Sequence, residues 1–79
     1  MKVRLKLIGS YRKLFPPKTK GSSIEVEIPR GTTVAGLVSQ FGVPLTEDSV
    51  IVVNGLSMDW ETPLAEGDEI SAFSAMAGG

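Results

Sequence analysis

The chain has 79 residues, 42% of them hydrophobic, and its eight Lys or Arg and nine Asp or Glu leave a net charge of −1. This length allows one domain with a modest core, and the apolar content is too high for a disordered chain. There is no cysteine and no histidine, which excludes disulfides, thiolate metal sites, a cysteine nucleophile and the commonest catalytic base. The near-neutral charge excludes a general basic field that would hold nucleic acid.

The charges are unevenly distributed along the chain. The basic residues all precede position 31, whereas most of the acids follow position 46. Such asymmetry can guide a partner, although a solvated surface is the simpler meaning. The later acids have no paired spacing on a regular element, so we interpret them as surface charges and assign no metal site; they are Asp59, Glu61, Glu66, Asp68 and Glu69.

The sequence shows no membrane or export signal. No segment approaches the roughly 18 consecutive apolar residues of a membrane span. The first residues alternate in polarity instead of forming the apolar core of a signal peptide. We therefore expect a cytoplasmic protein.

The first third of the chain predicts a strand, a turn and a loop. Within residues 2–8, three basic side chains alternate with three apolar ones as far as Leu7, which is the period of a half-buried strand. Tyr11, Leu14 and Phe15 then recur at near-helical spacing, and the two prolines that follow must end any helix by Phe15. Residues 16–23 are rich in Pro, Lys, Thr, Gly and Ser, which predicts an exposed, mobile connection.

The middle of the chain predicts a second strand followed by the main helix. Residues 24–28 alternate again and end in the turn residues of Pro29-Arg30-Gly31. Thr32 or Thr33 can cap the next segment, which Gly42 and Pro44 end. Its apolar residues have the spacing of an amphipathic helix: Val34, Leu37, Val38 and Phe41.

The last third predicts two or three strands. Residues 50–53 are a continuous β-branched run, apolar on both sides, as expected for a strand covered by its neighbours. Asn54-Gly55 is the strongest turn signal in the chain, and residues 56–60 can return as a short strand or irregular edge. A turn-rich group around Gly67-Asp68 then precedes a final apolar strand over residues 70–75.

This order of elements predicts an α+β fold in which one helix lies across a mixed sheet of four or five strands. The helix should cover the apolar face that the first two strands offer, which is made by Val3, Leu5, Leu7, Ile24, Val26 and Ile28. If the first and last strands pair side by side, they are parallel and central. We predict one domain over residues 1–75 and a flexible tail over residues 76–79 that leaves the sheet from its middle.

The tail ends in Gly78-Gly79. Because glycine has no Cβ, such a tail can lie extended in a slot too narrow for other residues, with its terminal carboxylate open to a partner's active site. A free carboxylate is a poor electrophile, so it must be activated by ATP as an acyl-adenylate before sulfur or an amine can attack. The chain would then be the substrate of this chemistry.

Several short motifs together resemble the MoaD/ThiS sulfur carriers of the ubiquitin-like β-grasp class, which are the molybdopterin synthase small subunit and the thiamine sulfur carrier. The resemblance covers essentially the whole chain. It is carried by the order of elements and by the motifs Val53-Asn54-Gly55, Leu64, Glu66-Gly67-Asp68-Glu69-Ile70 and Gly78-Gly79. The first and third motifs we interpret as tight turns that define the fold and have no catalytic role.

The resemblance implies that the carboxylate of Gly79 is adenylated by a ubiquitin-activating-like enzyme, which uses ATP, and is converted to a thiocarboxylate. The sulfur comes from a donor such as a cysteine desulfurase or a rhodanese and is delivered to a cofactor precursor. A large synthase subunit is a further possible partner. No permanently bound cofactor, nucleic acid or membrane is expected, and the chain itself is not an enzyme.

Residues before the glycines are candidates for partner binding. If Ile70 faces the helix, Phe73 lies on the other side of the final strand, near the root of the tail, where an exposed aromatic ring can anchor a partner. The aligned aromatic residue in the similar carriers contacts the activating enzyme. Met76 could extend the same apolar patch, and Ala77 and Gly78 are the further partner-binding candidates of the tail. The opposite orientation would put Phe73 in the core. Trp60 we interpret as a partly buried edge residue.

The pathway stays open at this stage. The length and the extra turn near Tyr11 resemble the molybdopterin type more than the thiamine type, but Ser74-Ala75 stands where molybdopterin-type carriers often have Pro-Pro. Two other classes compete: a protein modifier, joined through Gly79 to a lysine of another protein, and a β-grasp interaction module with an inert tail.

Overall fold

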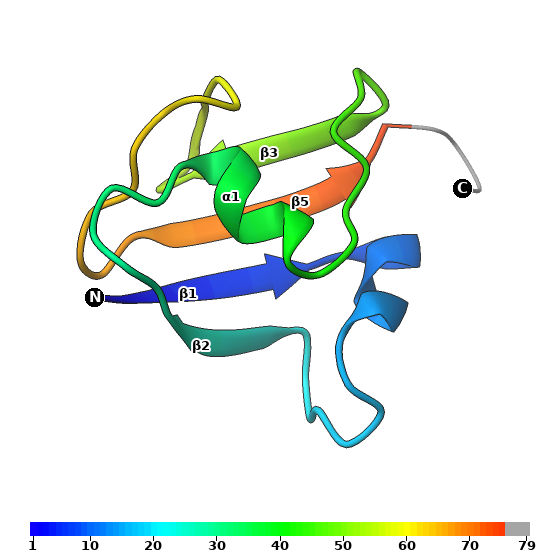
Figure 1. The fold of residues 1–79 in the computed structure, drawn as a ribbon. Helices are drawn as coiled ribbons and strands as arrows, with labels where there is room; N and C mark the ends of the chain where they lie inside the picture. Colours follow the sequence, from blue (N-terminus) through cyan, green and yellow to red (C-terminus); the bar gives the residue numbers. More distant parts are fainter. Residues whose placement is uncertain (76–79) are drawn as a thin grey trace.

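Five strands form one mixed sheet in the order β2-β1-β5-β3-β4 (Figure 1). We describe a computed structural model of the chain, in which residues 1–75 are placed. The elements in chain order are β1 (Lys2–Leu7), the 3₁₀ helix η1 (Gly9–Leu14), β2 (Ser23–Glu27), α1 (Val34–Ser39), β3 (Ser49–Val53), β4 (Leu56–Ser57) and β5 (Glu69–Ser74). Each strand predicted from alternation or from an apolar run is present, within about one residue of its expected start.

The first and last strands are parallel neighbours at the centre of the sheet, as expected. Leu5 lies beside Ile70 and Leu7 beside Ala72 in the register of this pair. The other strand pairs, β1 with β2, β5 with β3 and β3 with β4, are antiparallel. The chain therefore closes its sheet only when β5 enters between β1 and β3.

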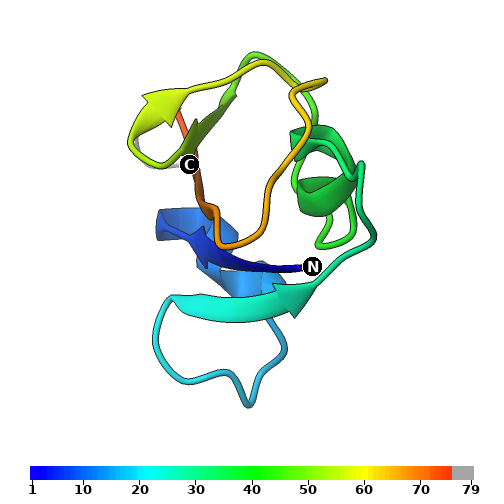
Figure 2. The ribbon, with the colours of Figure 1, turned by 90° about the vertical axis from the view of Figure 1, so that its left-hand side faces the viewer.

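Helix α1 covers one face of the sheet, and the figures show it on that side alone (Figures 1 and 2). Thr33 is its cap, because the Thr33 hydroxyl accepts a hydrogen bond of 3.1 Å from the N–H of Gly36. Three of its own residues, Val34, Leu37 and Val38, are fully buried. None of the helices in residues 1–75 has the length and apolar character needed to span a bilayer.

The helix is shorter than its apolar spacing predicts. It ends at Ser39, and Phe41 lies beyond it in a turn that Gly42 closes with a φ of 84°, a left-handed conformation that glycine adopts without strain. Phe41 still packs against the core, with its ring edge-on to that of Phe15 at a centroid distance of 5.7 Å. An aromatic contact with Phe15, which directly follows η1, thus takes the place of the last helical turn.

Element η1 closes the end of the sheet where β1 stops, as the near-helical spacing of its residues predicts. Tyr11 is buried, and its hydroxyl shares a buried hydrogen bond with the hydroxyl of Ser49 at the start of β3. This bond satisfies the buried polar atoms of both residues. It also ties the turn after the first strand to the third strand.

Strand β3 is less covered than its apolar run predicts. Ile51 and Val53 are buried on the helix side, but Val50 and Val52 are only half-buried on the other face of the sheet. No helix lies over that second face in residues 1–75 (Figure 2). We call it the open face.

The core makes a direct prediction about stability. Leu37 is fully buried, whereas Leu56 on β4 is 63% exposed. Leu37→Ala should lower the free energy of unfolding by about 2 to 5 kcal/mol, because it removes buried methyl groups and leaves a cavity. Leu56→Ala should change it by less than about 0.5 kcal/mol. Urea denaturation of both variants measures the difference, and equal losses would contradict this assignment of the core.

Candidate functional site

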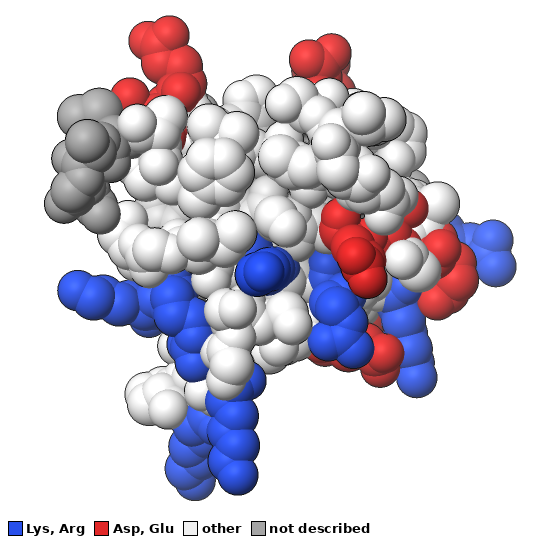
Figure 3. All heavy atoms as spheres, turned by 180° about the vertical axis from the view of Figure 1, so that it is seen from behind, with Lys and Arg blue, Asp and Glu red and all other residues white. Residues whose placement is uncertain are grey.

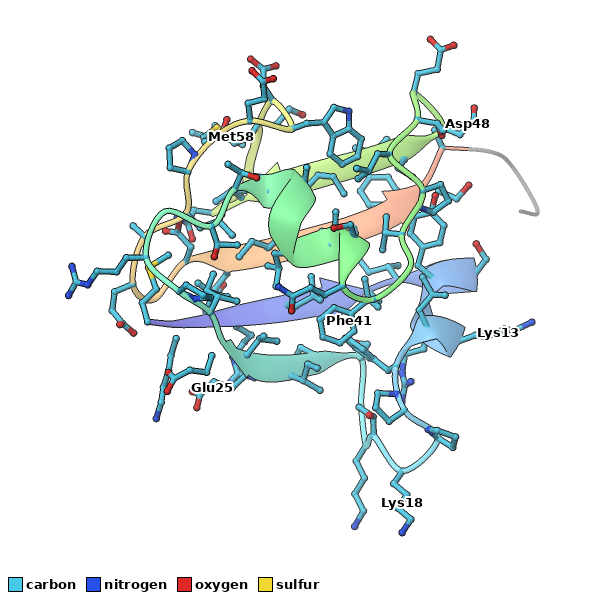
Figure 4. The ribbon with its side chains drawn as sticks, viewed as in Figure 1. Lys13, Lys18, Glu25, Phe41, Asp48 and Met58 are labelled. Atoms are coloured by element: carbon cyan, nitrogen blue, oxygen red, sulfur yellow. The ribbon has the colours of Figure 1, made fainter. Side chains whose placement is uncertain are left out.

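The candidate site begins where β5 ends. The N–H of Ala75 donates a hydrogen bond of 2.7 Å to the carbonyl of Asp48, and Ala75 itself is exposed. Figure 4 shows Asp48 at this end of the sheet, above the last residues of β5. The chain is thus held to the segment at the start of β3 through Ala75, the last residue that the structure describes.

The predicted tail residues come next. Met76, Ala77, Gly78 and Gly79 lie outside the residues that the structure describes. Their roles therefore remain predictions from the sequence. The described part of the site is the surface around the end of β5.

Phe73 lies on the open face, as the sequence predicts for the case in which Ile70 faces the helix. Ile70 and Ala72 are buried on the helix side, with exposed fractions of 1% and 0%. Phe73 alternates with them, is half-buried and takes no part in the buried core. The alternative orientation, in which Phe73 belongs to the core, is wrong. Whether this ring contacts a partner stays a prediction.

Two further apolar side chains lie beside Phe73. Val50 of β3 is its direct cross-strand neighbour. Ile8, just past β1, has extended backbone angles, and its N–H donates to the carbonyl of Ala72 at 3.0 Å. The alternation of β1 thus continues through Ile8 and turns its side chain, 39% exposed, to the open face. We call Ile8, Phe73 and Val50 the open-face row.

Charged residues border this row. Lys2, Arg4 and Lys6 of β1 project to the open face, because the residues between them are buried on the helix side. Figure 3, which shows this face, has basic side chains below an area of uncharged ones that reaches the end of the described chain. The open face is therefore divided into a charged part and an apolar part.

The sequence reasoning identified Phe73 but missed Ile8 and Val50. A signal was present for Ile8, because it is the one apolar residue on the charged side of the alternating run at positions 2–8. Val50 gave no such signal, because it lies in a uniformly apolar run. Only the register between β3 and β5 places it beside Phe73.

The turn motifs of the sequence interlock at the opposite end of β5. The side-chain amide of Asn54 donates to Asp68 Oδ1 at 2.9 Å, while its oxygen accepts from the N–H of Glu69, also at 2.9 Å. Asp68 Oδ2 in turn accepts from the N–H of Ala65 at 2.8 Å. Asn54 has a φ of 51°, which asparagine tolerates better than most residues. These contacts join the turn after β3 to the turn before β5, which supports reading both motifs as structural turns.

The remaining acids and the tryptophan have ordinary surroundings. Within residues 1–75, no three His, Cys, Asp or Glu side chains are grouped so that they could hold a metal ion. The same residues form no detectable pocket. Trp60 is half-buried against the core and its carbonyl accepts a hydrogen bond from the N–H of Ala35 at 2.9 Å, as expected for an edge residue.

A mixed sheet with parallel first and last strands at its centre and one helix across it defines the ubiquitin-like β-grasp class. The model of the Mut7-C ubiquitin family matches residues 1–77. The chain belongs to this family. No curated protein sequence matches it significantly.

Solved structures give the same fold. SAMP1 from Haloferax volcanii aligns with a TM-score of 0.78 and 17% identity over 100% of both chains. A putative molybdopterin converting factor, subunit 1, from Pyrococcus furiosus aligns with a TM-score of 0.73 and 26% identity over 95% of this chain and 98% of that one. Subunits 1 and 2 of the molybdopterin-converting factor from Helicobacter pylori form a complex, of which one chain aligns with a TM-score of 0.61 and 20% identity over 100% of both. The predicted β-grasp fold and the resemblance to the MoaD/ThiS carriers are confirmed.

We call the side-chain contacts of Asn54 and Asp68 with the two turns the turn lock. Its contribution to stability can be tested without a substitution in the core. Asn54→Gly keeps a residue suited to positive φ but removes the side-chain bonds to Asp68 and Glu69. We expect a loss of about 0.5 to 1.5 kcal/mol in the free energy of unfolding, because the variant loses the side-chain hydrogen bonds of Asn54, while water can reach the exposed N–H of Glu69. Ser57→Ala, on exposed strand β4, is the matched control and should change stability by less than about 0.5 kcal/mol. Chemical denaturation measures both, and an unchanged Asn54→Gly variant would show that the lock contributes little.

Proposed function

We propose that this chain is a sulfur carrier that works through the carboxylate of Gly79. An adenylating partner joins this carboxylate to the AMP part of ATP and releases pyrophosphate. The outer sulfur of a persulfide on the donor protein then displaces AMP and forms an acyl disulfide. A thiol attacks the donor's sulfur in this S–S bond, which releases the thiocarboxylate and leaves a disulfide between that thiol and the donor. The thiocarboxylate donates its sulfur in cofactor biosynthesis, with molybdopterin as the first candidate pathway and thiamine as the second.

The observation that carries this proposal is the position of β5. As a central strand it is fixed on both sides, and it ends at Ser74. Exposed Ala75 follows directly, two residues after Phe73 of the open-face row, which is an apolar surface that a partner can contact. The similarity to the Pyrococcus furiosus molybdopterin converting factor subunit, at 26% identity, supports the same function.

In this proposal the chain is a substrate and a carrier, and the enzymes are its partners. It has no cysteine to carry sulfur and no histidine to act as a base. Sulfur and ATP are therefore handled by the donor and the adenylating enzyme. A larger synthase subunit is a third partner, which the complex of subunits 1 and 2 from Helicobacter pylori supports by analogy.

A second candidate function is protein modification. The Haloferax volcanii structures include one named small archaeal modifier protein 1, which covers 95% of this chain with a TM-score of 0.76. A modifier would share the adenylation of Gly79 but would end in an amide bond to a lysine of another protein. The two candidates differ in the product, so a measurement of mass separates them.

Intact-protein mass spectrometry after incubation with host extract and ATP tests the proposal. A carrier should gain the mass of one oxygen-to-sulfur exchange, whereas a modifier should appear in higher-mass conjugates. Deleting Gly79, or adding a residue after it, should abolish either product. The free energy of unfolding should stay within about 0.5 kcal/mol, because the deletion leaves the core of residues 1–75 intact.

The controls give these outcomes a clear meaning. The extract must contain the adenylating enzyme. Its activity can be shown independently by the exchange of label between ATP and pyrophosphate. Sulfur transfer by the chain that lacks Gly79 would contradict the role of this residue. An unmodified full-length chain in an extract with active adenylating enzyme would favour an inert interaction module.

Phe73 should anchor the adenylating enzyme. Phe73→Ala should weaken binding by at least about 2 kcal/mol, as expected for an aromatic residue at the centre of an interface. Leu56→Ala removes a more exposed apolar side chain at the other end of β3 and should bind normally. Isothermal titration calorimetry measures both affinities, and thermal melts show whether each variant is folded. Normal binding by folded Phe73→Ala would refute the anchor.

A further inference from the structure

The two edges of the sheet differ in how well they are protected. Edge strand β4 has two residues, which is too short to offer a useful row of hydrogen-bonding groups. Edge strand β2 has five residues, with no proline and no bulge inside it. An edge of this kind is a template on which another strand can pair.

The hydrogen bonds of β2 show which of its backbone groups are free. Met1 and Ile28 exchange hydrogen bonds of 2.7 and 2.8 Å, and the N–H of Leu7 donates to the carbonyl of Ser22 at 3.0 Å. In an antiparallel pair such bonded positions alternate, so residues 24 and 26 also bond to β1. The N–H and C=O groups of residues 23, 25 and 27 therefore point away from the sheet.

The open face of this edge carries alternating charge. Glu69 of β5, Arg4 of β1 and Glu25 of β2 are neighbours in one row across the sheet. Lys2 and Glu27 are neighbours in the next row, and Lys2 Nζ also lies 3.9 Å from Glu25 Oε1. Each row ends at the edge with an exposed carboxylate. The position beside it, where a further strand would lie, thus favours a positive side chain.

The helix side of the same edge is apolar. Ile24 and Val26 are half-buried and pack against the core. Phe41 lies beyond the end of α1 over the β1 and β2 side of the sheet (Figure 4). An added strand would place its alternate residues next to Ile24 and Val26, where apolar side chains gain burial.

A second copy of the chain does not fit this edge. Antiparallel pairing of two β2 strands about Glu25 would bring carboxylates of the two copies directly opposite one another, and like charges in that position destabilise the pair. In this register the exposed carboxylates of the edge oppose self-association and favour a strand of opposite charge.

We propose that β2 is a docking edge for an extended segment of another protein in which Lys or Arg alternates with apolar residues. The segment adds a strand through the backbone groups of residues 23, 25 and 27. Its basic side chains lie opposite Glu25 and Glu27 on the open face, and its apolar ones lie beside Ile24 and Val26. This surface does not include the tail or the open-face row, so it does not depend on the proposed carrier function.

A short acetylated and amidated peptide with alternating arginine and valine is the probe. It is titrated into the full-length chain labelled with nitrogen-15, and amide shifts and hydrogen exchange are followed by NMR. We expect shifts centred on β2 and slower exchange of the amides of residues 23, 25 and 27. A peptide with alternating glutamate and valine should not bind.

Charge variants test the recognition. Glu25→Lys combined with Glu27→Lys should weaken peptide binding by at least about fivefold, since both cross-strand charge pairs become repulsive. Glu25→Gln combined with Glu27→Gln should have a smaller effect in the same direction. This variant keeps the test valid if the lysine variant does not fold. Asp59→Lys combined with Glu61→Lys has the same change in net charge away from β2, and its affinity should match that of the natural chain.

Three results would overturn the proposal. The first is an absence of shifts on β2 at millimolar peptide. The second is a set of shifts on the open-face row without slower exchange at the edge, which would mean binding to the face. The third is equal weakening by the Asp59 and Glu61 variant, which would mean attraction by net charge alone.

Discussion

The parallel pairing of β1 with β5 organises the whole domain. It places residues from the two ends of the described chain side by side at the sheet centre, with Leu5 beside Ile70 and Leu7 beside Ala72, all nearly or fully buried. Backbone hydrogen bonds from Arg4 to Asp68 and from Ile8 to Ala72 continue this contact at both ends. Because the two strands run in the same direction, the end of β1, with Ile8 and η1, meets the end of β5.

This pairing also separates the surfaces of the sheet. The core uses the helix side of the strands, so the open face and the β2 edge are the surfaces of the sheet that are left for the proposed partners. The open-face row lies at the end of β5, and the Asn54 and Asp68 lock lies at the beginning of β5. The free backbone groups of β2 lie on the far side of β1 from β5. A partner on the row and a partner on the β2 edge could therefore bind independently.

The sequence predicts those features that depend on local periodicity. The alternation in residues 2–8 and 24–28 places β1 and β2 almost correctly, and Thr33 caps α1 because a threonine side chain can satisfy a free N–H. Features that depend on contacts between distant segments could not be predicted in this way. Phe41 fits a helical pattern, but its contact with Phe15 and the turn at Gly42 end the helix earlier.

The same distinction applies to the candidate site. Alternation alone shows that Phe73 and Ile70 lie on opposite sides of a strand, but it does not show which side the helix covers. That choice depends on packing across the sheet, as does the position of Val50. Backbone turns such as Asn54-Gly55 are easier, because one residue type fits the conformation. Alternation places Glu25 and Glu27 on one side of β2, but their pairing with the basic residues of β1 follows only from the register of the two strands.

The open-face row is assembled from three separate segments of the chain, and this has a consequence for how the protein is made. Ile8, Val50 and Phe73 come together only after β5 has inserted between β1 and β3. During synthesis the ribosome must release β5 before the sheet can close, and such long-range pairing is slow compared with local folding. A nascent or misfolded chain therefore lacks the row. A partner that needs all three side chains for binding would therefore bind the folded protein in preference to an incomplete or misfolded chain.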